Sequence, residues 1–518
     1  MSTRRARVAR GAFSTASMTL TSNVTGFLRQ LAFAWIYGAG RDMDAFLIAS
    51  VLSQMVFASV DSAISATLIP VYTQLRQVSE EDAALFLKAV SGLVTAVTVS
   101  VGLVCYLFAP ELVHLLAPGF GGAETRLSVV LLRVMMPSLV FMGLASVSAG
   151  FLQTKGAFGR PAGMYIPRNV ALIVLAAWLG HRYGVSVLAL GSLLGAVLQL
   201  YMVWVQMRRL GGSLRLAWKP RHQGIRTMLR RLPGVFANSF MYSAALMVDR
   251  ILASGLAPGM ISALNYAQLL INFPLGLLTS LAIAMFPTLS ELAASEAGPE
   301  LSRAVRIALR LLTFLVAPIS LFAIFLRAPL VAIVYAHGAF GTQAVDDTAF
   351  AMLFFALGMI SMALNGVIGR TIFALGETRI LYSSAAWGVG TTIVMDLILI
   401  HPLQQGGLAL GTTLGSWAST IVLLRFLAGR LPQFTVRPIL GDALLSTLLA
   451  TVSFGAVFVV YTRLHGAAQP HGLVHLAMLL VATFLAGAAL YLLLHRMFSR
   501  RRIDWRRLLR EGVQTIGR

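Results

Sequence analysis

Charged residues inside apolar segments are the side chains of this 518-residue sequence that could do chemistry. Arg29 lies within the apolar stretch VTGFLRQLAFAWIYGAGRDMDAF, and Asp249 and Arg250 lie at a similar depth within NSFMYSAALMVDRILASGLAPG. A bilayer penalises a charge at this depth, so such residues generally face a water-filled cavity or the interior of a helix bundle. A guanidinium in a cavity can bind a phosphate or diphosphate through parallel hydrogen bonds. The alternatives are an arginine that extends to the lipid headgroups and, for Asp249 and Arg250, a purely structural ion pair.

Neutral polar residues accompany these charges. The candidate substrate-binding residues are Asn23 and Arg29 in the first apolar segment, Gln54 in the second, Arg250 in the seventh, and Asn265, Gln268 and Asn272 in the eighth. Amides and hydroxyls suit a sugar, and guanidinium groups suit a diphosphate, whereas a cationic drug would require acids or aromatic rings. The combination of arginines with amides therefore favours an anionic substrate that carries sugar.

Acidic residues form a second, smaller set. Asp61 shares one face of the second segment with Gln54 at helical spacing, where it could take a proton, bind a cation or pair with an arginine. Asp44 and Asp249 are, with Asp61, candidates for gating or structural charges. Asp396 is a candidate cation site, with a position at the membrane surface as the alternative.

No residue pattern typical of an enzyme is found. The sequence contains no P-loop GxxxxGK(S/T), no HExxH and no GxSxG with partner residues. Cys105 is the single cysteine, which excludes an internal disulfide and a cysteine-rich metal site. We therefore expect a protein that is not an enzyme and holds no metal or cofactor, with the identity of any coupling ion left open.

Transmembrane helices are the elements that must position these residues. Hydrophobic residues make up 58% of the chain and charged residues 12%, with a mean hydropathy of +0.80, whereas soluble domains carry about 25% charged residues. An apolar segment of about 20 residues spans the membrane core as a helix. Fourteen such segments are predicted, at 13–37, 45–70, 86–108, 128–151, 162–181, 185–206, 233–255, 262–289, 306–327, 347–369, 380–400, 407–426, 441–463 and 472–494. The fold class is therefore an all-α integral membrane protein, whose first and seventh segments are amphipathic.

Loop charge predicts the orientation in the membrane. The connection at 208–231 has eight Lys or Arg residues and no acid, and the tail from residue 496 on has eight arginines. Because cytoplasmic loops are enriched in Lys and Arg, both regions and both termini are expected in the cytoplasm. This bias accounts for the formal charge of +22 without nucleic acid as a partner. The basic regions are either solvated surfaces or contacts for anionic membrane lipids.

Internal similarity predicts two related halves. ATLIPVYTQL at 66–75 matches AMFPTLSEL at 284–292, and two further pairs of segments follow at nearly the same offset. Such repeats are typical of secondary transporters with a central site between the halves. The predicted organisation is an N-terminal six-helix half at 1–207, a basic cytoplasmic linker at 208–232, a C-terminal six-helix half at 233–430, two additional transmembrane helices at 431–495 and a basic cytoplasmic tail at 496–518.

Two motifs resemble a known family. TSNVTGFLRQLAFAWIYGAGRDMDAFLIASVL is similar to the first two helices of the MviN/MurJ family, and ISALNYAQLLINFPLGLLTSLAIAMFPTLSELA is similar to its eighth helix. The resemblance covers most of the chain. It implies the multidrug/oligosaccharidyl-lipid/polysaccharide exporter superfamily, alternating access between two halves, and relatives that flip lipid-linked envelope precursors, lipid II above all. It also implies that the last two helices form a groove for a polyprenyl tail.

The family's site residues carry over only in part. Arg29 matches the second arginine of the first-helix motif, and Asp44 matches the acid of the DAF element. Asn23 stands where the first arginine is expected, and Leu269 replaces the arginine of the eighth helix. The paired basic residues of the second helix are absent. Our hypothesis is that Arg250 restores one of the missing charges from the opposite helix.

The expected function is that of a flippase in the bacterial inner membrane. It would move lipid II or another polyprenyl-diphosphate-linked glycan. An exopolysaccharide repeat unit is the alternative cargo; the choice is open, and the missing arginines add weight to this alternative. Membrane lipids and proteins of envelope synthesis are the other expected partners. Two alternatives belong to different classes: a multidrug or cation antiporter, and a scaffold for envelope synthesis that transports nothing.

Overall fold

The computed structural model describes residues 2–295, 298–431, 433–467 and 472–498. All regular elements in these ranges are helices. For helical residues 2–13, 231, 233–244, 279–288 and 464–467 only the backbone is described. The predicted basic tail lies outside the described residues from residue 499 on. The predicted N-terminal tail is helical from Ser2 and continuous with the first helix.

Two compact units make up the chain. The first comprises Met1–Ser262 and His337–Gly341, and the second comprises Ala263–Ala336 and Thr342–Arg518. The predicted repeat begins its second half at 233, but the helix that contains this position, Gln223–Ser254, packs within the first unit. The domain boundaries derived from the internal similarity therefore stay a prediction about related halves.

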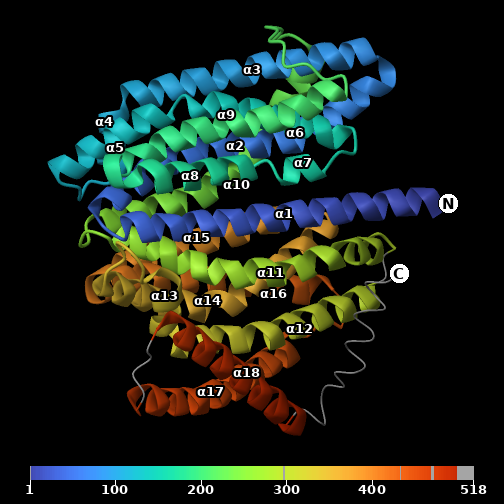
Figure 1. Cartoon of the computed structure of the whole chain (residues 1–518). Helices are drawn as coiled ribbons and strands as arrows, with labels where there is room; N and C mark the ends of the chain where they lie inside the picture. Colours follow the sequence, from blue (N-terminus) through green and yellow to red (C-terminus); the bar gives the residue numbers. More distant parts are fainter. Residues whose placement is uncertain (1, 296–297, 432, 468–471, 499–518) are drawn as a thin grey trace. The chain divides into compact units, whose positions relative to one another are not determined.

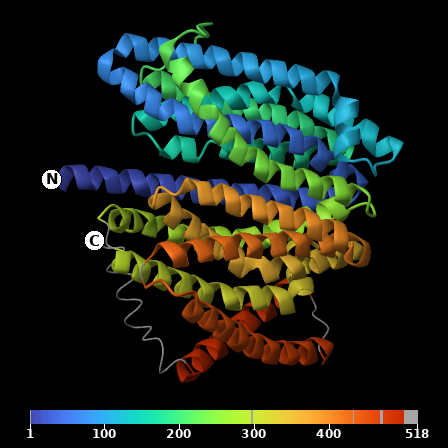
Figure 2. The same cartoon turned by 180° about the vertical axis from the view of Figure 1, so that it is seen from behind.

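The first unit is a bundle of long helices that run side by side (Figures 1 and 2). Its helices are α1 (Ser2–Tyr37), α2 (Arg41–Val78), α3 (Glu80–Leu107), α4 (Ala109–Leu116), α5 (Gly122–Met135), α6 (Ser138–Thr154), α7 (Gly159–Ala162), α8 (Ile166–Tyr183), α9 (Ser186–Arg209) and α10 (Gln223–Ser254). Helix α2 packs against α3, α5, α6 and α10, and every residue from Met43 to Ser50 is buried. This helix is therefore the centre of the unit.

Small residues let these helices approach closely. A Cβ added to Gly143 of α6 would lie 2.9 Å from a Val94 methyl of α3, and one added to Gly195 of α9 would lie 3.0 Å from the Cα of Arg168 in α8. Helices in lipid associate through van der Waals packing, because lipid is as apolar as their side chains. Glycines at these positions thus determine which helix faces meet.

The second unit contains the remaining helices. They are α11 (Met260–Ala294), whose first turn belongs to the first unit, α12 (Gly298–Phe325), α13 (Arg327–Tyr335), α14 (Thr342–Ala374), α15 (Thr378–Leu403), α16 (Gln405–Arg430), α17 (Val436–Ala467) and α18 (Leu473–Phe498). Helices α17 and α18 cross each other beside α12 (Figure 1). Tyr491 of α18 donates a hydrogen bond to the Phe314 carbonyl (3.1 Å), and Asp442 of α17 pairs with Arg310. The two additional helices are thus attached to α12.

The predicted class, an all-α protein that crosses the membrane many times, is confirmed. Among the described residues, eleven helices are long and apolar enough to span a membrane, or twelve if α5 and α6, bent by 42° at their junction, form one span. Helices α1 and α10 are also long, with 36 and 32 residues, and they correspond to the two amphipathic segments. These two helices are not among the eleven or twelve, so the count of fourteen spans is consistent with the structure and stays a prediction.

Helices α15 and α16 meet along a row of glycines, which makes their packing sensitive to single methyl groups. A Cβ added to Gly415 would collide with Thr392 and lie 2.6 Å from the Gly388 carbonyl oxygen. We expect Gly415→Ala to lower the melting temperature in detergent, since overpacking typically costs about 1–3 kcal/mol. Gly429→Ala is the control on the same helix, because its Cβ would meet nothing within 4 Å. Equal melting temperatures for the two variants would contradict this packing.

Candidate functional site

Arg29 is held in place by a polar contact between α1 and α8. Its Nη1 donates to the Asn169 side-chain oxygen (3.0 Å), and the Asn169 amide donates to the Thr25 hydroxyl (3.2 Å) and the Ser22 carbonyl (3.4 Å). Gly26 lies between these α1 residues, and a Cβ there would lie 3.5 Å from the Asn169 amide nitrogen. The small polar face of α1 therefore packs on Asn169, which orients the guanidinium.

Arg168, which is not among the residues predicted from the sequence, is a second half-buried arginine at this site. It precedes Asn169 in the first turn of α8, and its charge acts on that of Arg29 as a repulsion. The Nε atoms of both arginines are buried and form no hydrogen bond with the described residues. Two like charges with unused donors are costly unless an anion offsets them. The pair is therefore an arrangement that a bound anion would stabilise.

Phe33 contacts Arg29, and Tyr165 connects the start of α8 to Phe57 and Asp61 of α2. The Arg29 guanidinium lies 5.7 Å from the centre of the Phe33 ring, a favourable cation–π position. Tyr165, one turn before Arg168, packs edge to face against Phe57 of α2, with the two ring centres 6.4 Å apart. Asp61 of α2 accepts a hydrogen bond from Ser146 of α6 (2.5 Å), and its charge acts on Tyr165. Asp61 forms no ion pair within the described chain, so its carboxylate has one hydroxyl as its hydrogen-bond donor.

Asp44 lies in a different environment, at the junction between α2 and the start of α11. Its carboxylate is 3% exposed and accepts hydrogen bonds from the Gly259 N–H (2.6 Å), the Ser262 N–H (2.8 Å) and the Ser262 hydroxyl (2.6 Å). It thereby satisfies N–H groups in the first turn of α11, as an N-cap does. Its contacts are those of a structural charge.

Arg250 belongs to the same junction. Its Nη1 donates to the Ile261 carbonyl (3.2 Å), and the carboxylates of Asp249 and Asp44 both act on its charge. These contacts differ from those of Arg29 and Arg168. The roles predicted for Arg250 in substrate binding and for Asp249 in gating stay predictions. The positive charge of Arg250 is offset by two nearby carboxylates, unlike the charges of Arg29 and Arg168.

The remaining predicted residues are dispersed. Asn23 and Gln54 are exposed, and Gln54 donates to Ser50 within its own helix (3.1 Å). In the second unit, Asn265 and Gln268 are half-buried and Asn272 is exposed on α11. The Asn265 amide nitrogen is buried without a hydrogen bond to the described residues. Their proposed role in binding a substrate is not decided by these positions.

Asp396 is fully buried between α15 and α16. Its carboxylate lies against Gly411, where a Cβ would collide with it. No cluster of three or more His, Cys, Asp or Glu side chains suited to a metal occurs among the residues that the structure describes. Its role as a cation site stays a prediction.

Sequence and structure comparisons give a consistent result. Residues 33–499 match the family described as Lipid II flippase MurJ. The chain is 26% identical over 426 residues to a protein named Lipid II flippase MurJ from Burkholderia cenocepacia, covering 80% of this chain and 82% of the relative. It is 25% identical over 469 residues to a probable lipid II flippase MurJ from Synechocystis, covering 86% and 87%.

Two solved structures share the fold. A lipid II flippase MurJ in an inward closed conformation superposes with a TM-score of 0.79 at 21% identity, covering 94% of this chain and 98% of that one. An inward-facing multidrug resistance MATE family transporter of the MOP superfamily gives 0.65 at 14% identity, covering 81% and 98%. The fold therefore recurs in both groups of transporters.

Proposed function

Because the chain belongs to the MurJ family of lipid II flippases, we propose that it moves lipid II or a closely related polyprenyl-diphosphate-linked glycan across the bacterial inner membrane. The observation that carries this proposal is the pair of arginines, Arg29 and Arg168, whose buried Nε groups form no hydrogen bond with any described residue. A diphosphate offers several acceptor oxygens and negative charge, which would satisfy both guanidinium groups and remove their mutual repulsion.

Arg168 would supply one of the charges that the family motif carries and this sequence lacks. Asn23 stands where the family's first arginine is expected, and Leu269 replaces a further one. In this chain, Arg168 would supply the second charge from α8, next to Arg29 on α1. Its place in the first turn of α8 adds the positive potential of the helix N-terminus. An anionic substrate is therefore supported even though the family motif is incomplete.

The transport cycle would depend on binding of the substrate's diphosphate by the arginine pair, with the site open to one side of the membrane and then to the other. Rocking of two halves around a fixed site is the general alternating-access mechanism of such repeats. Asn169 would keep Arg29 oriented, and Asp61, next to Tyr165, would be the nearby group able to take a proton or cation during the cycle. The basic loop at 208–231 and both termini would lie in the cytoplasm, by the positive-inside bias. Proteins of envelope synthesis would supply and consume the lipid-linked glycan.

Complementation tests the proposal. In a bacterial strain depleted of its own lipid II flippase, we expect the wild-type chain to restore growth and Arg29→Ala to fail, because the diphosphate would lose one of its two cations. Membrane levels of both proteins are measured by immunoblotting. Equal growth with the wild-type chain and with Arg29→Ala would contradict the role of Arg29.

Other outcomes would favour the alternatives. Failure of a well-inserted wild-type protein to restore growth would exclude lipid II as a sufficient cargo and favour an exopolysaccharide repeat unit, tested with a strain that lacks that flippase. Uptake of a cationic dye by vesicles, unaffected by Arg29→Ala, would favour an antiporter. A scaffold would tolerate Arg29→Ala in every assay but not changes in the basic loop.

A further inference from the structure

A second group of cations, remote in the sequence from Arg29, surrounds a pocket at one end of the first unit. Lys88 of α3, Arg208 at the end of α9 and Arg215 of the linker line it, together with Trp204 and Leu214. Its volume of about 620 Å³ suits a small ligand or a lipid headgroup. None of its lining residues is acidic, and none of the three cations forms an ion pair within the described part of the chain.

The end of α9 directs the linker over this pocket. Gly211 has a positive φ of 78°, a conformation that glycine adopts without strain. The Gly212 N–H bonds to the Met207 carbonyl (2.9 Å) and the Gly211 N–H to the Arg208 carbonyl (3.1 Å), the two bonds of a Schellman motif. This reversal ends the helix, and the chain continues through Arg215 as one wall of the pocket.

The linker is then fixed to α3. The Ala217 N–H donates to the Lys88 carbonyl (3.1 Å). One turn further along α3, Gly92 leaves room for the linker backbone, because a Cβ there would collide with the Ala217 carbonyl. The wall that carries Arg215 is thus attached to the helix that carries Lys88.

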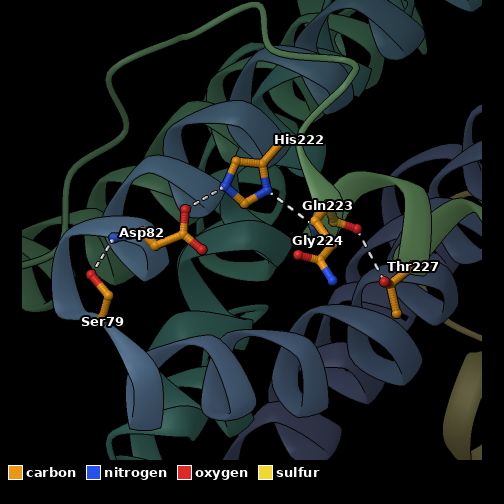
Figure 3. Close-up of polar contacts among 6 residues, drawn as sticks. All are labelled: Ser79, Asp82, His222, Gln223, Gly224 and Thr227. Carbon is orange, nitrogen blue, oxygen red and sulfur yellow. Dashed lines mark hydrogen bonds and ion pairs between the residues drawn. The ribbon is translucent and has the colours of Figure 1, made fainter.

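His222 fixes the far end of the same linker (Figure 3). Its Nε2 lies 3.0 Å from Asp82 Oδ1, and its Nδ1 accepts the Gly224 N–H (3.0 Å) at the start of α10. The Gly224 bond makes Nδ1 the acceptor, so Nε2 carries the hydrogen donated to Asp82. Ser79, the N-cap residue of α3, accepts a hydrogen bond from the backbone N–H of Asp82 (3.2 Å). The linker that forms one wall of the pocket is therefore fixed at both of its ends.

The aromatic residues around the pocket indicate where a ligand comes from. The Arg208 guanidinium lies 5.1 Å from the centre of the Trp204 ring, and Tyr201 on the same face is 60% exposed. In the linker, Trp218 is 67% exposed. Helix α9 is long and apolar enough to span the membrane and ends at Arg209, so its last turn lies at headgroup depth. Exposed Trp and Tyr are typical of this depth.

We propose that this pocket binds the phosphate of an anionic phospholipid headgroup, in the leaflet that the C-terminal end of α9 reaches. Lys88, Arg208 and Arg215 bind the phosphate, and Trp204 and Leu214 contact the glycerol backbone and the first methylenes. The site is separate from the arginine pair proposed for the transported lipid. A bound headgroup bridges α3, α9 and the linker, and thereby stabilises the folded protein.

The experiment compares two double variants of the full chain with the same loss of charge. Arg208→Gln/Arg215→Gln removes two pocket cations, whereas Lys219→Gln/Arg221→Gln removes two exposed cations of the same linker that do not line the pocket. Purified proteins in a neutral detergent are titrated with phosphatidylglycerol, phosphatidylcholine or inorganic phosphate, and bound lipid and melting temperature are measured. Both variants are first checked by size-exclusion chromatography, where each must elute as a single monodisperse peak.

We expect phosphatidylglycerol to bind the wild type and the linker control within about twofold of each other. The pocket variant should bind it about tenfold or more weakly, because two of the three cations that contact the phosphate are gone. Equal weakening of both variants would mean a diffuse electrostatic attraction and would overturn the site. Equal binding of phosphatidylcholine, or saturation by inorganic phosphate with no lipid binding, would overturn the assignment to an anionic lipid. Ser213→Glu, which leaves all cations in place and adds a carboxylate to the lining, must also weaken binding.

Discussion

Arg168→Ala is expected to abolish growth in the complementation assay while leaving the protein as stable as the wild type, or more stable. Arg168 and Arg29 repel each other, and their Nε groups form no hydrogen bond with the residues that the structure describes. Removal of one charge relieves this repulsion. The same removal deprives the diphosphate of a guanidinium, and a charge-assisted hydrogen bond contributes about 1.5–3 kcal/mol, equivalent to an affinity loss of roughly 10- to 100-fold.

The combination of lost function with retained stability distinguishes a binding residue from a structural one. A structural arginine lowers the melting temperature and the activity together when it is removed. Arg168→Lys keeps the charge but not the planar geometry, so it should restore part of the growth. Arg182→Ala, an exposed arginine at the other end of α8, is the control and should grow normally. Full growth with Arg168→Ala would remove this residue from the proposed site.

Asp44→Ala is expected to cause the largest loss of stability of the single substitutions considered. Asp44 accepts three hydrogen bonds, two from N–H groups and one from a hydroxyl, at the start of α11. Alanine would leave these donors buried without an acceptor, at about 1–3 kcal/mol each. Arg250 would also lose a nearby negative charge. We expect the melting temperature in detergent to fall by about 5 °C or more.

Asp42→Ala is the matched control for this prediction. Asp42 and Asp44 both lie in the first turn of α2, so both variants lose the interaction of an acid with the helix dipole. Asp42 is exposed, whereas Asp44 is buried. The difference between their melting temperatures therefore isolates the contacts of Asp44 with Gly259 and Ser262. Equal melting temperatures would contradict the structural role of this carboxylate.

The arginine site could be predicted from the sequence only in part. Arg29 was found because an arginine deep in an apolar segment is conspicuous in a single helix. Arg168 lies inside the predicted segment 162–181, so the same rule could have selected it. Arg168 lies close to the predicted cytoplasmic end of that segment, where arginines are common, so its position in the sequence does not distinguish it from a loop arginine. Arg29 precedes Arg168 by 139 positions, and no local sequence pattern indicates that the two charges lie close enough to interact.

Arg250 shows why depth alone does not decide the role of a charge. Its place in the seventh segment, level with Arg29, suggested that it would replace a missing family arginine. In the structure, its hydrogen bond is to the Ile261 carbonyl, and Asp249 and Asp44 act on its charge. Depth in a membrane is a property of one helix, but the direction that a side chain faces depends on how that helix is rotated against its neighbours.

The sequence by itself determined the fold class, the approximate number of spans, the family and the presence of intramembrane charge. These follow from the transfer of each segment into lipid, a free energy that depends on the residues of that segment alone. The tertiary structure decided which polar groups meet: Arg29 with Asn169 and Arg168, Asp44 with α11, and Asp396 with Gly411. Those contacts depend on close approach between helices far apart in the sequence, which glycines such as Gly26 and Gly195 permit. Because lipid provides no hydrophobic force between helices, this short-range packing decides the partners, and it is not encoded in any single segment.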